Sequence, residues 1–567
     1  MNLIPNVKSL KIKQGYLATK AIFYDNLQCD SRVISALSDL PFNKTGVNLK
    51  INIKGKNGEG YELLIEENQI VITSDSVAGA FYAVQTLKQI FKEEKIPCLH
   101  IIDKPDFEYR GFYHDVTRGK IPKVETIKAL IDKMAFYKLN SLQLYVEHTF
   151  EFEECKELNE KTGCLTKDEI EEIDRYCYEH FIEFIPSIAT FGHMYEILQQ
   201  DKYCHLRVLN DFEEAENFWH SRMQHHTIDP LQEESIELVK SLINQYVPHF
   251  KSEYFNICCD ETFDLKKYEA EGYDVGKLYV DFVKKIINYV SLNDKKIMMW
   301  ADILLQHPEV IDELPEDTYF LNWNYSSDPS EENIMQFSKL RRKQIVCPGT
   351  STWNRLCENI AVEERNISLM AEYGYKHGAV GLLNTNWGDW GNPCSIELAM
   401  YGMVLGAEKS WSVNTEINNA FYGKVNKILY ESENGTQNIK ALSDLHGHIN
   451  WGIFCDNYFK HKYKTDANYR MAIFSDIKGI QQEYLNFVKE IGKEEWKNNE
   501  YKNEILISAE GICVIAELTA KLFKIELERV TNTEEWIKKY SDSWLGKNKP
   551  SELYRIKEMF YYCEAEY

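Results

Sequence analysis

The sequence predicts an α/β protein: a (β/α)8 TIM barrel preceded by a small α+β domain and followed by a mostly helical C-terminal region. Strand-like apolar runs alternate with amphipathic stretches through the middle of the chain, which is typical of a parallel sheet. Eight such runs lie within a span of ordinary barrel length. The flanking parts show different patterns. We therefore expect three domains, over residues 1–105, 106–410 and 411–567.

The first domain combines short strands with an amphipathic helix. Strand-like alternation covers residues 47–53, 61–65 and 69–73. Ser74 or Ser76 can cap the helix that follows, whose apolar residues recur at helical spacing. Pro97 and Pro105 mark the expected boundary with the barrel.

Eight strand-like runs make up the predicted barrel. They cover residues 109–116, 141–146, 183–188, 254–259, 297–300, 319–323, 344–347 and 378–383. Amphipathic stretches lie between or after most of them, at residues 124–137, 167–181, 233–247, 280–290 and 396–405. The segment 190–229 is too long for a simple connection and carries Gly192-His193, so we expect an active-site loop there. After residue 411, Lys, Glu, Leu and Ile at helical spacing predict helices without a chemical motif.

Composition disfavours several classes of partner. The net charge of −23 argues against nucleic acid, which requires concentrated Lys and Arg, and equally against anionic membranes and acidic polysaccharides. No apolar stretch reaches membrane-spanning length. A neutral substrate fits this charge best, and the many aromatic residues offer flat faces for a sugar ring. The oligomeric state stays open, a homodimer included.

The cysteines and the N-terminus predict a cytoplasmic location. The 14 cysteines contain no CxxC pair, and several lie in apolar strands as small hydrophobic residues, which is typical of a reduced intracellular protein. The first residues lack the charged start and apolar core of a signal peptide. A secreted chain whose signal had been removed would look the same.

Asp260 and Glu261 are the most informative residues of the sequence. They follow directly on the apolar run 254–259, which we expect to be a buried barrel strand. Two carboxylates at such a strand end are costly to desolvate, so they are expected to meet solvent or a ligand. If the strand continued through them, they would point to opposite sides and could have different roles. An acidic strand end without function is the alternative.

Further polar and aromatic residues lie at the other predicted strand ends, where a barrel carries its chemistry. They are Arg118, Glu147, His193, Trp300, Asp302, Trp323, Tyr325, Trp353, Trp387 and Asp389. Each tryptophan alone could be a packed structural residue, and Arg118 could simply pair with Asp115. Together, aromatic walls and acids predict a pocket for a sugar ring.

No catalytic metal or other cofactor is expected. His225-His226 has no carboxylate or cysteine at ligand spacing, so we expect a surface pair rather than a metal site. His193 is not followed by a second histidine at the spacing of a zinc helix.

These motifs resemble those of glycoside hydrolase family 20, the β-N-acetylhexosaminidases. The matching stretches are residues 111–118 and 122–140, Phe191-Gly192-His193, Cys259-Asp260-Glu261 and Trp387-Gly388-Asp389. The helix at residues 74–87 is similar to one in the small domain that precedes the family's barrel. The resemblance covers roughly residues 45–405.

The resemblance implies retaining, substrate-assisted catalysis, in which the 2-acetamido oxygen of the sugar attacks the anomeric carbon. Glu261 would be the general acid and base, and Asp260 would orient the acetamide and stabilise its developing charge. Arg118 and Asp389 would hold the distal hydroxyls, and the tryptophans would line the acetamide pocket and the sugar face. Glu147, His193 and Asp302 would stand behind the acids and orient them.

Three departures from the family pattern stand out. Glu147-His148 occupies the end of strand two, where the family usually has Asp-Asp or Asp-Gln-like residues. Asp389 is one methylene shorter than the family's closing Glu. Trp353 and its neighbours replace an expected Tyr-x-Asp, so Tyr325 is a substitute candidate for the hydroxyl that binds the acetamide oxygen. These changes are typical of a divergent member of the family.

The resemblance implies an exo-β-N-acetylhexosaminidase that removes terminal β-linked N-acetylglucosamine (GlcNAc) or N-acetylgalactosamine (GalNAc) from oligosaccharides or glycoconjugates. The expected substrate partner is this carbohydrate, with an N-acetylhexosamine at its non-reducing end. Two alternatives remain: a family member that releases a disaccharide, and a catalytically inactive sugar-binding protein.

Overall fold

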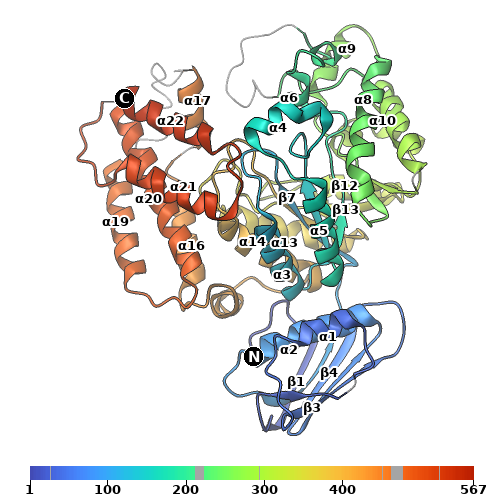
Figure 1. Cartoon of the computed structure of the whole chain (residues 1–567), viewed down its shortest axis with the longest axis vertical. Helices are drawn as coiled ribbons and strands as arrows, with labels where there is room; N and C mark the ends of the chain where they lie inside the picture. The colour runs from blue at the N-terminus through green and yellow to red at the C-terminus, as the bar shows by residue number, and fades with distance from the viewer. Residues whose placement is uncertain are drawn as a thin grey trace.

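The computed structural model describes residues 1–25, 27–210, 223–292, 294–449, 451–460, 477–522 and 524–566. Part of the predicted active-site loop, residues 211–222, therefore lies outside the described residues. The chain forms a small N-terminal domain, a barrel and a helical C-terminal region, and the last of these packs along one side of the barrel (Figure 1). This arrangement confirms the predicted fold class.

The N-terminal domain is a six-stranded sheet with two helices on one face (Figure 1). Its strands are β1 Ser9–Tyr16, β2 Ile22–Phe23, β3 Val47–Ile53, β4 Tyr61–Glu66, β5 Gln69–Ser74 and β6 Pro97–Asp103, in the order β1-β6-β4-β5-β3-β2. The helices are α1 Ser31–Leu37 and α2 Val77–Phe91, and Ser76 caps α2 through the Gly79 N–H. Pro97 was expected at a boundary, but it begins β6, a position that requires no ladder N–H.

The barrel contains eight parallel strands, so the eight predicted runs all form strands. They are β7 Tyr109–Asp115, β8 Ser141–Tyr145, β9 Glu183–Ile185, β10 Tyr254–Asn256, β11 Lys296–Trp300, β12 Tyr319–Trp323, β13 Lys343–Cys347 and β14 Gly381–Asn386. Hydrogen-bonded ladders join seven pairs of neighbouring strands, in the order β10-β11-β12-β13-β14-β7-β8-β9. A single bridge between Ser187 and Asn256 joins β9 to β10 and closes the ring.

Helices surround this ring. The longer ones are α3 Val124–Phe136, α5 Lys167–Glu179, α8 Glu233–Tyr246, α10 Val275–Ser291, α12 Glu331–Lys339, α13 Ile360–Lys376 and α14 Met400–Trp411. The short ones are η1 Glu153–Cys155, α4 Lys156–Thr162, α6 Tyr195–Leu198, η2 Cys204–Leu206, η3 Val247–His249, η4 Phe263–Leu265, α9 Lys266–Ala270, α11 Asp302–Gln306, η5 Pro308–Glu313 and η6 Ile396–Ala399.

The C-terminal region is helical, as predicted. Its helices are α15 Asn419–Val425, η7 Asn426–Tyr430, α16 Gly435–His446, α17 Trp451–Lys460, α19 Ile477–Gly492, α20 Asn499–Leu522, α21 Thr533–Lys547 and α22 Leu553–Glu566. Their buried faces share one hydrophobic core with the barrel helices. None of the helices in the described part of the chain has the length and apolarity to cross a membrane.

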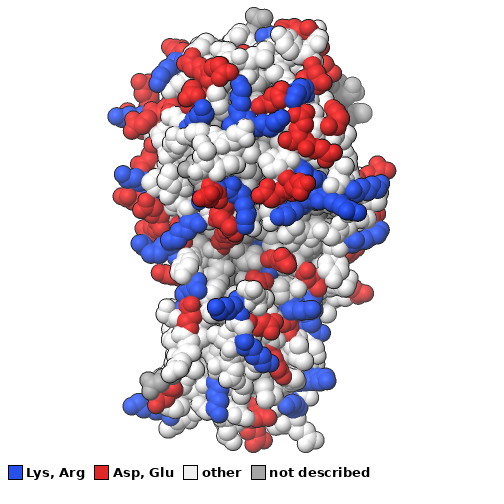
Figure 2. Space-filling model, turned by 90° about the vertical axis from the view of Figure 1, so that its right-hand side faces the viewer, with Lys and Arg blue, Asp and Glu red and all other residues white. Residues whose placement is uncertain are grey.

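The N-terminal domain meets the barrel through buried charges. Asp103, at the end of β6, accepts hydrogen bonds from Tyr61 Oη (2.6 Å), Lys138 Nζ (3.1 Å) and Trp411 Nε1 (3.0 Å). Arg110, at the start of the barrel, pairs with Glu59 of the small domain. On the face of the molecule seen in Figure 2, acidic and basic side chains are interspersed, so the net negative charge forms no single patch there.

Candidate active site

A small pocket of about 150 Å³ lies where the barrel strands end at their C-termini. Its lining consists of Arg118, Tyr145, His193, Asp260, Glu261, Trp300, Trp323, Tyr325, Trp353, Trp387 and Asp389. Apart from Tyr145, all of these are residues that the sequence singles out. The other two predicted residues, Glu147 and Asp302, contact members of the lining.

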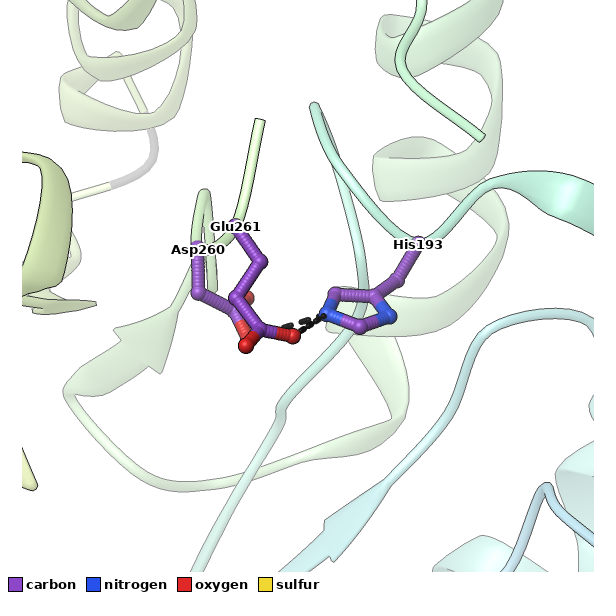
Figure 3. A group of neighbouring side chains, drawn as sticks. All are labelled: His193, Asp260 and Glu261. Atoms are coloured by element: carbon purple, nitrogen blue, oxygen red, sulfur yellow. Dashed lines mark hydrogen bonds and ion pairs between the residues drawn. The ribbon is translucent and has the colours of Figure 1, made fainter. Parts of the chain in front are cut away.

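Asp260 and Glu261 do not lie on a strand, which corrects the expectation from the run 254–259. Strand β10 ends at Asn256, and Cys258, Cys259 and Glu261 have φ values of 57°, 67° and 49°. Such left-handed residues are uncommon outside glycine and turn the chain sharply. The two carboxylates therefore do not alternate to opposite sides but converge on His193 (Figure 3).

His193 lies between the two acids. Its Nε2 is 3.1 Å from Glu261 Oε2 and 3.3 Å from Asp260 Oδ2, and its Nδ1 is 3.9 Å from Glu147 Oε1. Burial alone would lower the pKa of His193, but the charges and hydrogen bonds of Asp260 and Glu261 outweigh it and raise this pKa well above its usual value. The two acids therefore favour the protonated, imidazolium form of this ring.

Glycine at position 192 permits this approach. A Cβ atom built there would lie 2.2 Å from the backbone oxygen of Asp260, so the loop after β9 and the loop after β10 touch backbone to backbone. The His193 N–H donates to Nδ1 of His226 at 2.8 Å. His225 and His226 are both buried, which corrects the expectation of a surface pair. Burial and the neighbouring His193 lower the pKa of His226, so that its neutral ring can accept this bond.

Asp302 holds the backbone of Glu261. Its Oδ2 accepts the Glu261 N–H at 2.9 Å, and it is the first residue of the short helix α11. Burial, together with the charge of Asp260, raises the pKa of Asp302 to about 7. A third carboxyl group thus stands behind the acid pair.

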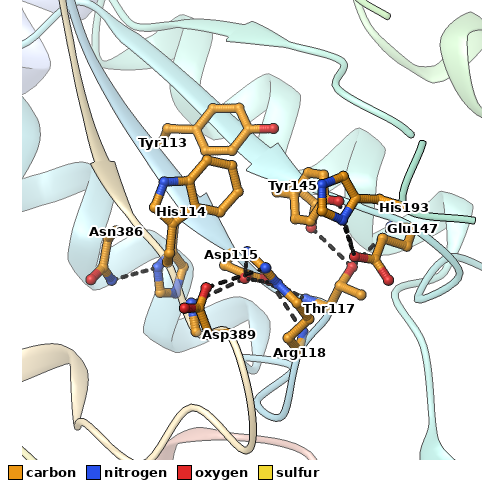
Figure 4. Close-up of polar contacts among 12 residues, drawn as sticks. Tyr113, His114, Asp115, Thr117, Arg118, Tyr145, Glu147, His193, Asn386 and Asp389 are labelled. Carbon is orange, nitrogen blue, oxygen red and sulfur yellow. Dashed lines mark hydrogen bonds and ion pairs between the residues drawn. The ribbon is translucent and has the colours of Figure 1, made fainter. Parts of the chain in front are cut away.

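Arg118 pairs with Asp115 and also reaches the pocket. Its Nε donates to Asp115 Oδ2 at 2.7 Å, and its Nη1 lies 3.2 Å from Asp389 Oδ1 (Figure 4). Asp115 also accepts from the N–H groups of Thr117 and Gly388. The pairing with Asp115 that the sequence left open is present, but it orients the guanidinium toward Asp389.

Aromatic rings form the remaining walls. Tyr325 stacks on Trp323 with ring centroids 5.1 Å apart, and Trp353 contacts the same tyrosine ring. Trp387 Nε1 donates to Tyr325 Oη at 2.7 Å, and the same hydroxyl also bonds the side chain of Thr385. The buried Trp300 Nε1 has no hydrogen-bond partner among the described residues, so it too can serve a ligand.

Tyr145 is the lining residue that the sequence reading missed. It is the last residue of β8, its hydroxyl donates to Glu147 Oε1 at 2.9 Å, and its ring lies beside the Arg118 guanidinium. Strand alternation places residues two apart on the same face, so the prediction for Glu147 implies an inward position for Tyr145 as well.

His193, Asp260 and Glu261 are also the cluster, among the described residues, whose donor atoms could hold a metal ion, since these atoms all lie within 4.8 Å of one another. The raised pKa of His193 means that a metal would first have to displace the proton from its ring.

Comparison with known proteins places both barrel and small domain in one family. The model "Glycosyl hydrolase family 20, catalytic domain" matches residues 107–354, and "Glycosyl hydrolase family 20, domain 2" matches residues 1–104. Beta-hexosaminidase of Porphyromonas gingivalis is 26% identical over 283 residues, covering 43% of this chain and 36% of that protein. Human hexosaminidase D is 26% identical over 250 residues, covering 42% of this chain and 49% of its own. The chain thus spans less than half the length of these curated relatives.

Solved structures share the fold. Chitobiase of Flavobacterium johnsoniae has a TM-score of 0.62 at 16% identity and covers 99% of both chains. A mutant β-hexosaminidase of Streptomyces plicatus in complex with its product GlcNAc has a TM-score of 0.58 at 18% identity, covering 78% of this chain and 95% of its own.

Proposed function

The chain belongs to glycoside hydrolase family 20, and from this premise we propose that it is an exo-β-N-acetylhexosaminidase. Its substrates would be oligosaccharides or glycoconjugates that end in β-linked GlcNAc or GalNAc. The names of its relatives, β-hexosaminidase and hexosaminidase D, support this class of substrate.

One observation carries the proposal: two carboxylates converge on an imidazolium inside a pocket of single-sugar size. The pocket is small, about 150 Å³, and is ringed by aromatic side chains, so it suits one pyranose ring better than a chain. Aromatic walls would stack on the apolar faces of the ring, and Arg118 with Asp389 would bind its hydroxyls.

In the proposed first step, the carbonyl oxygen of the sugar's own acetamide attacks the anomeric carbon. The bond from that carbon to the leaving oxygen breaks, and Glu261, which binds a proton in the reacting complex while Asp260 stays ionised, donates that proton to the leaving group. Asp260 accepts a hydrogen bond from the acetamide N–H and offsets the positive charge that develops in the oxazolinium ring.

In the second step, the Glu261 carboxylate takes a proton from water, and the water oxygen attacks the anomeric carbon. The oxazolinium ring opens, the acetamide is restored, and the sugar leaves with its configuration retained. His193 would hold both carboxylates in place during these steps, because its ring contacts Asp260 and Glu261 at once.

Tyr325 is our candidate for the group that binds the acetamide oxygen. Its oxygen accepts the Trp387 N–H, and its own proton would turn from the side chain of Thr385 to the carbonyl of a bound sugar. The unpaired Trp300 Nε1 in the same wall is a second donor.

Two features weigh against the alternative functions. Release of a disaccharide requires a pocket open beyond the first sugar, whereas the Arg118–Asp389 ion pair bounds this pocket. A sugar-binding protein without catalysis does not require an acid pair around a histidine, whose assembly uses four left-handed residues, His193 among them.

Hydrolysis of aryl N-acetyl-β-glucosaminides and N-acetyl-β-galactosaminides tests the proposal. We expect release of the aryl group, and a Glu261→Gln variant should lose about 10²- to 10⁴-fold in kcat/KM on poor leaving groups, because it lacks the general acid. It should lose far less on activated aryl groups, whereas Asp260→Asn should impair both. If the intact protein released no aryl group at any pH between 4 and 9, the proposed enzymatic activity would be wrong. If an analogue without the 2-acetamido group were cleaved as fast as the parent, the substrate-assisted mechanism would be wrong.

A further inference from the structure

Three loops that line the pocket also rest on the C-terminal helices. The loop after β7 carries Arg118, the loop after β13 carries Trp353, and the loop after β14 carries Trp387 and Asp389. The acids Asp260 and Glu261 come instead from the loop after β10, on the other half of the barrel ring. The C-terminal region therefore supports the sugar-binding half of the site, and toward the acid pair it also reaches Glu196, three residues after His193, through Arg555 at 3.8 Å.

The loop after β7 is paired with the turn between α21 and α22. Lys123 N donates to Lys547 O (2.9 Å), Lys549 N donates to Ile121 O (2.8 Å), and Glu552 N donates to the carbonyl of residue 119 (3.2 Å). A bridge between residues 122 and 548 makes this an antiparallel pairing. The backbone immediately after Arg118 is thus fixed by the C-terminal region.

The loop after β14 meets the same helices. Tyr540 Oη, on α21, donates to Pro393 O at 3.1 Å, and Trp390 packs against Trp451 of α17. A Cβ atom at Gly119 would lie 2.5 Å from the carbonyl carbon of Gly391, so the loops after β7 and β14 also touch each other.

Lys120, in the loop after β7, contacts both the loop after β14 and helix α21. It is two residues from Arg118 and almost fully buried, and its Nζ donates to Cys394 O in the loop after β14 at 2.6 Å. The same ammonium lies 4.9 Å from the centre of the Trp544 ring on α21. Burial lowers the pKa of Lys120 to about 8, so the group still carries its proton at pH 7.

We propose that Lys120, held against α21, is a positioning residue that sets the distance between Arg118 and Asp389 and thereby the recognition of the distal sugar hydroxyls. This inference rests on the proposed function for its substrate. The loop after β7 supplies Arg118, and the loop after β14 supplies Asp389, so the link between Lys120 and Cys394 spans the ion pair at 3.2 Å. The C-terminal helices would then act as a support for one half of the pocket.

Lys120→Met tests the proposal, because methionine keeps an apolar stem beside Trp544 but has no proton to donate to Cys394 O. We expect KM for an aryl N-acetyl-β-glucosaminide to rise about tenfold with kcat within about threefold, the pattern of lost ground-state binding. The ratio of kcat/KM between glucosaminide and galactosaminide should move closer to one, since these sugars differ at a distal hydroxyl. The pH dependence of kcat should not move, because the acid pair is untouched.

Lys138→Met is the matched control. Lys138 is a second buried lysine of the barrel, but its ammonium bonds Asp103 and Tyr61 next to the N-terminal sheet. This variant should lose stability and keep the wild-type KM within about twofold, so a general loss of stability is separated from a change in the pocket. Tyr540→Phe breaks the link to Pro393 from the helix side and should raise KM in the same direction, even if Lys120→Met fails to fold.

Several outcomes would overturn the inference while the proposed function stands. They are a wild-type KM in Lys120→Met, a KM increase no larger than that of Lys138→Met, or a loss confined to kcat. Absence of hydrolysis by the wild type would instead refute the proposed function. In that case a crystal structure of Lys120→Met decides: an Arg118–Asp389 distance still at 3.2 Å would refute the positioning role, and a longer one would support it.

Discussion

Among single residues, His193 is the one on which the site's electrostatics depend. Two carboxylates that approach the same point repel each other, and the imidazolium at 3.1 and 3.3 Å offsets that repulsion. Its own charge is in turn stabilised by both acids, so the three groups support one another in the folded state. Replacement of His193 would leave the two acids facing each other without the positive charge that offsets their repulsion.

Glu358 and Glu363 form a second buried acid pair, in which burial outweighs the favourable charge of Arg355 on Glu363. Both are fully buried, and Glu358 accepts the Gly402 N–H at 3.0 Å. Burial raises the pKa of each group well above its usual value, and the nearby Glu358 charge adds to the effect on Glu363. The folded protein therefore keeps protons that the unfolded chain releases above about pH 4.5.

Glu363→Gln should consequently stabilise the protein at neutral pH. With a raised folded pKa, wild-type stability falls as pH rises from the unfolded pKa towards the folded one, and glutamine removes the part of this dependence that Glu363 contributes. The variant should gain up to about 1.4 kcal/mol per pH unit over the wild type across that window, and little at pH 4. Urea unfolding at pH 4, 5.5 and 7 measures the difference.

Glu364→Gln is the control for this prediction. Glu364 follows Glu363 in α13 but pairs with Lys440 at 3.0 Å, so loss of its charge should not stabilise the protein. A stability gain of Glu363→Gln that is the same at pH 4 and pH 7 would contradict the proposed cause.

At this scale, the sequence predicted most of the pocket because polar and aromatic residues at strand ends are conspicuous. Tyr145 was missed because it lies inside an apolar strand, where a tyrosine is an ordinary core residue. The burial of His226 could not be predicted, since its partner is a backbone N–H from a loop more than thirty residues away.

At the scale of elements, strand β10 departs most from its prediction. The apolar run 254–259 reads as one strand, yet only Tyr254–Asn256 is extended. Cys258 and Cys259 adopt left-handed φ values that apolar patterns do not reveal, because these are imposed by contacts between loops rather than by local preference. The turn they form is what brings Asp260 and Glu261 to His193.

Gly192→Ala should disrupt this arrangement. The added Cβ would lie 2.2 Å from the Asp260 backbone oxygen, so the two loops must separate, and the His193 ring must leave the acids. We expect kcat/KM to fall at least about a hundredfold, since misplacement of catalytic groups by about 1 Å has effects of that size. Steady-state kinetics with an activated aryl glycoside, together with circular dichroism, would separate this loss from unfolding.

Gly423→Ala provides the comparison. Gly423 lies in α15, and a Cβ atom there meets nothing within 4 Å. The alanine should stabilise the helix by about 0.5 to 1 kcal/mol and leave kinetics unchanged. Wild-type activity in Gly192→Ala would show that the loops can separate without loss of the site.

At the scale of the whole molecule, the order of parts was predictable but their contacts were not. Strand-helix alternation identifies a barrel, and helical spacing identifies the C-terminal helices. Helical spacing does not say which surface a helix packs against, so the pairing of residues 547–552 with the segment behind Arg118 had no signal in the sequence. The same limit applies to the N-terminal sheet, whose contact with the barrel depends on single buried charges.

Asp103 joins the N-terminal sheet to two separate segments of the barrel. It belongs to β6, while Lys138 follows α3 and Trp411 ends α14. Asp103→Asn would leave the Lys138 ammonium buried without its counter-charge, which typically costs about 3 to 5 kcal/mol. The site itself should be unaffected. Lys138 precedes β8 and Trp411 ends α14, so this junction lies at the N-terminal end of the barrel strands, whereas the pocket lies at their C-terminal end.

A double-mutant cycle separates the ion pair from the rest of this junction. In Asp103→Asn with Lys138→Met the orphaned ammonium is gone, so the double variant should be more stable than the sum of the two single losses predicts. Urea unfolding of the four proteins gives the coupling energy. At urea concentrations below the unfolding transition of each protein, kcat/KM should stay within about twofold of the wild type. Strict additivity would mean that Asp103 acts through Tyr61 and Trp411 rather than through the charge of Lys138.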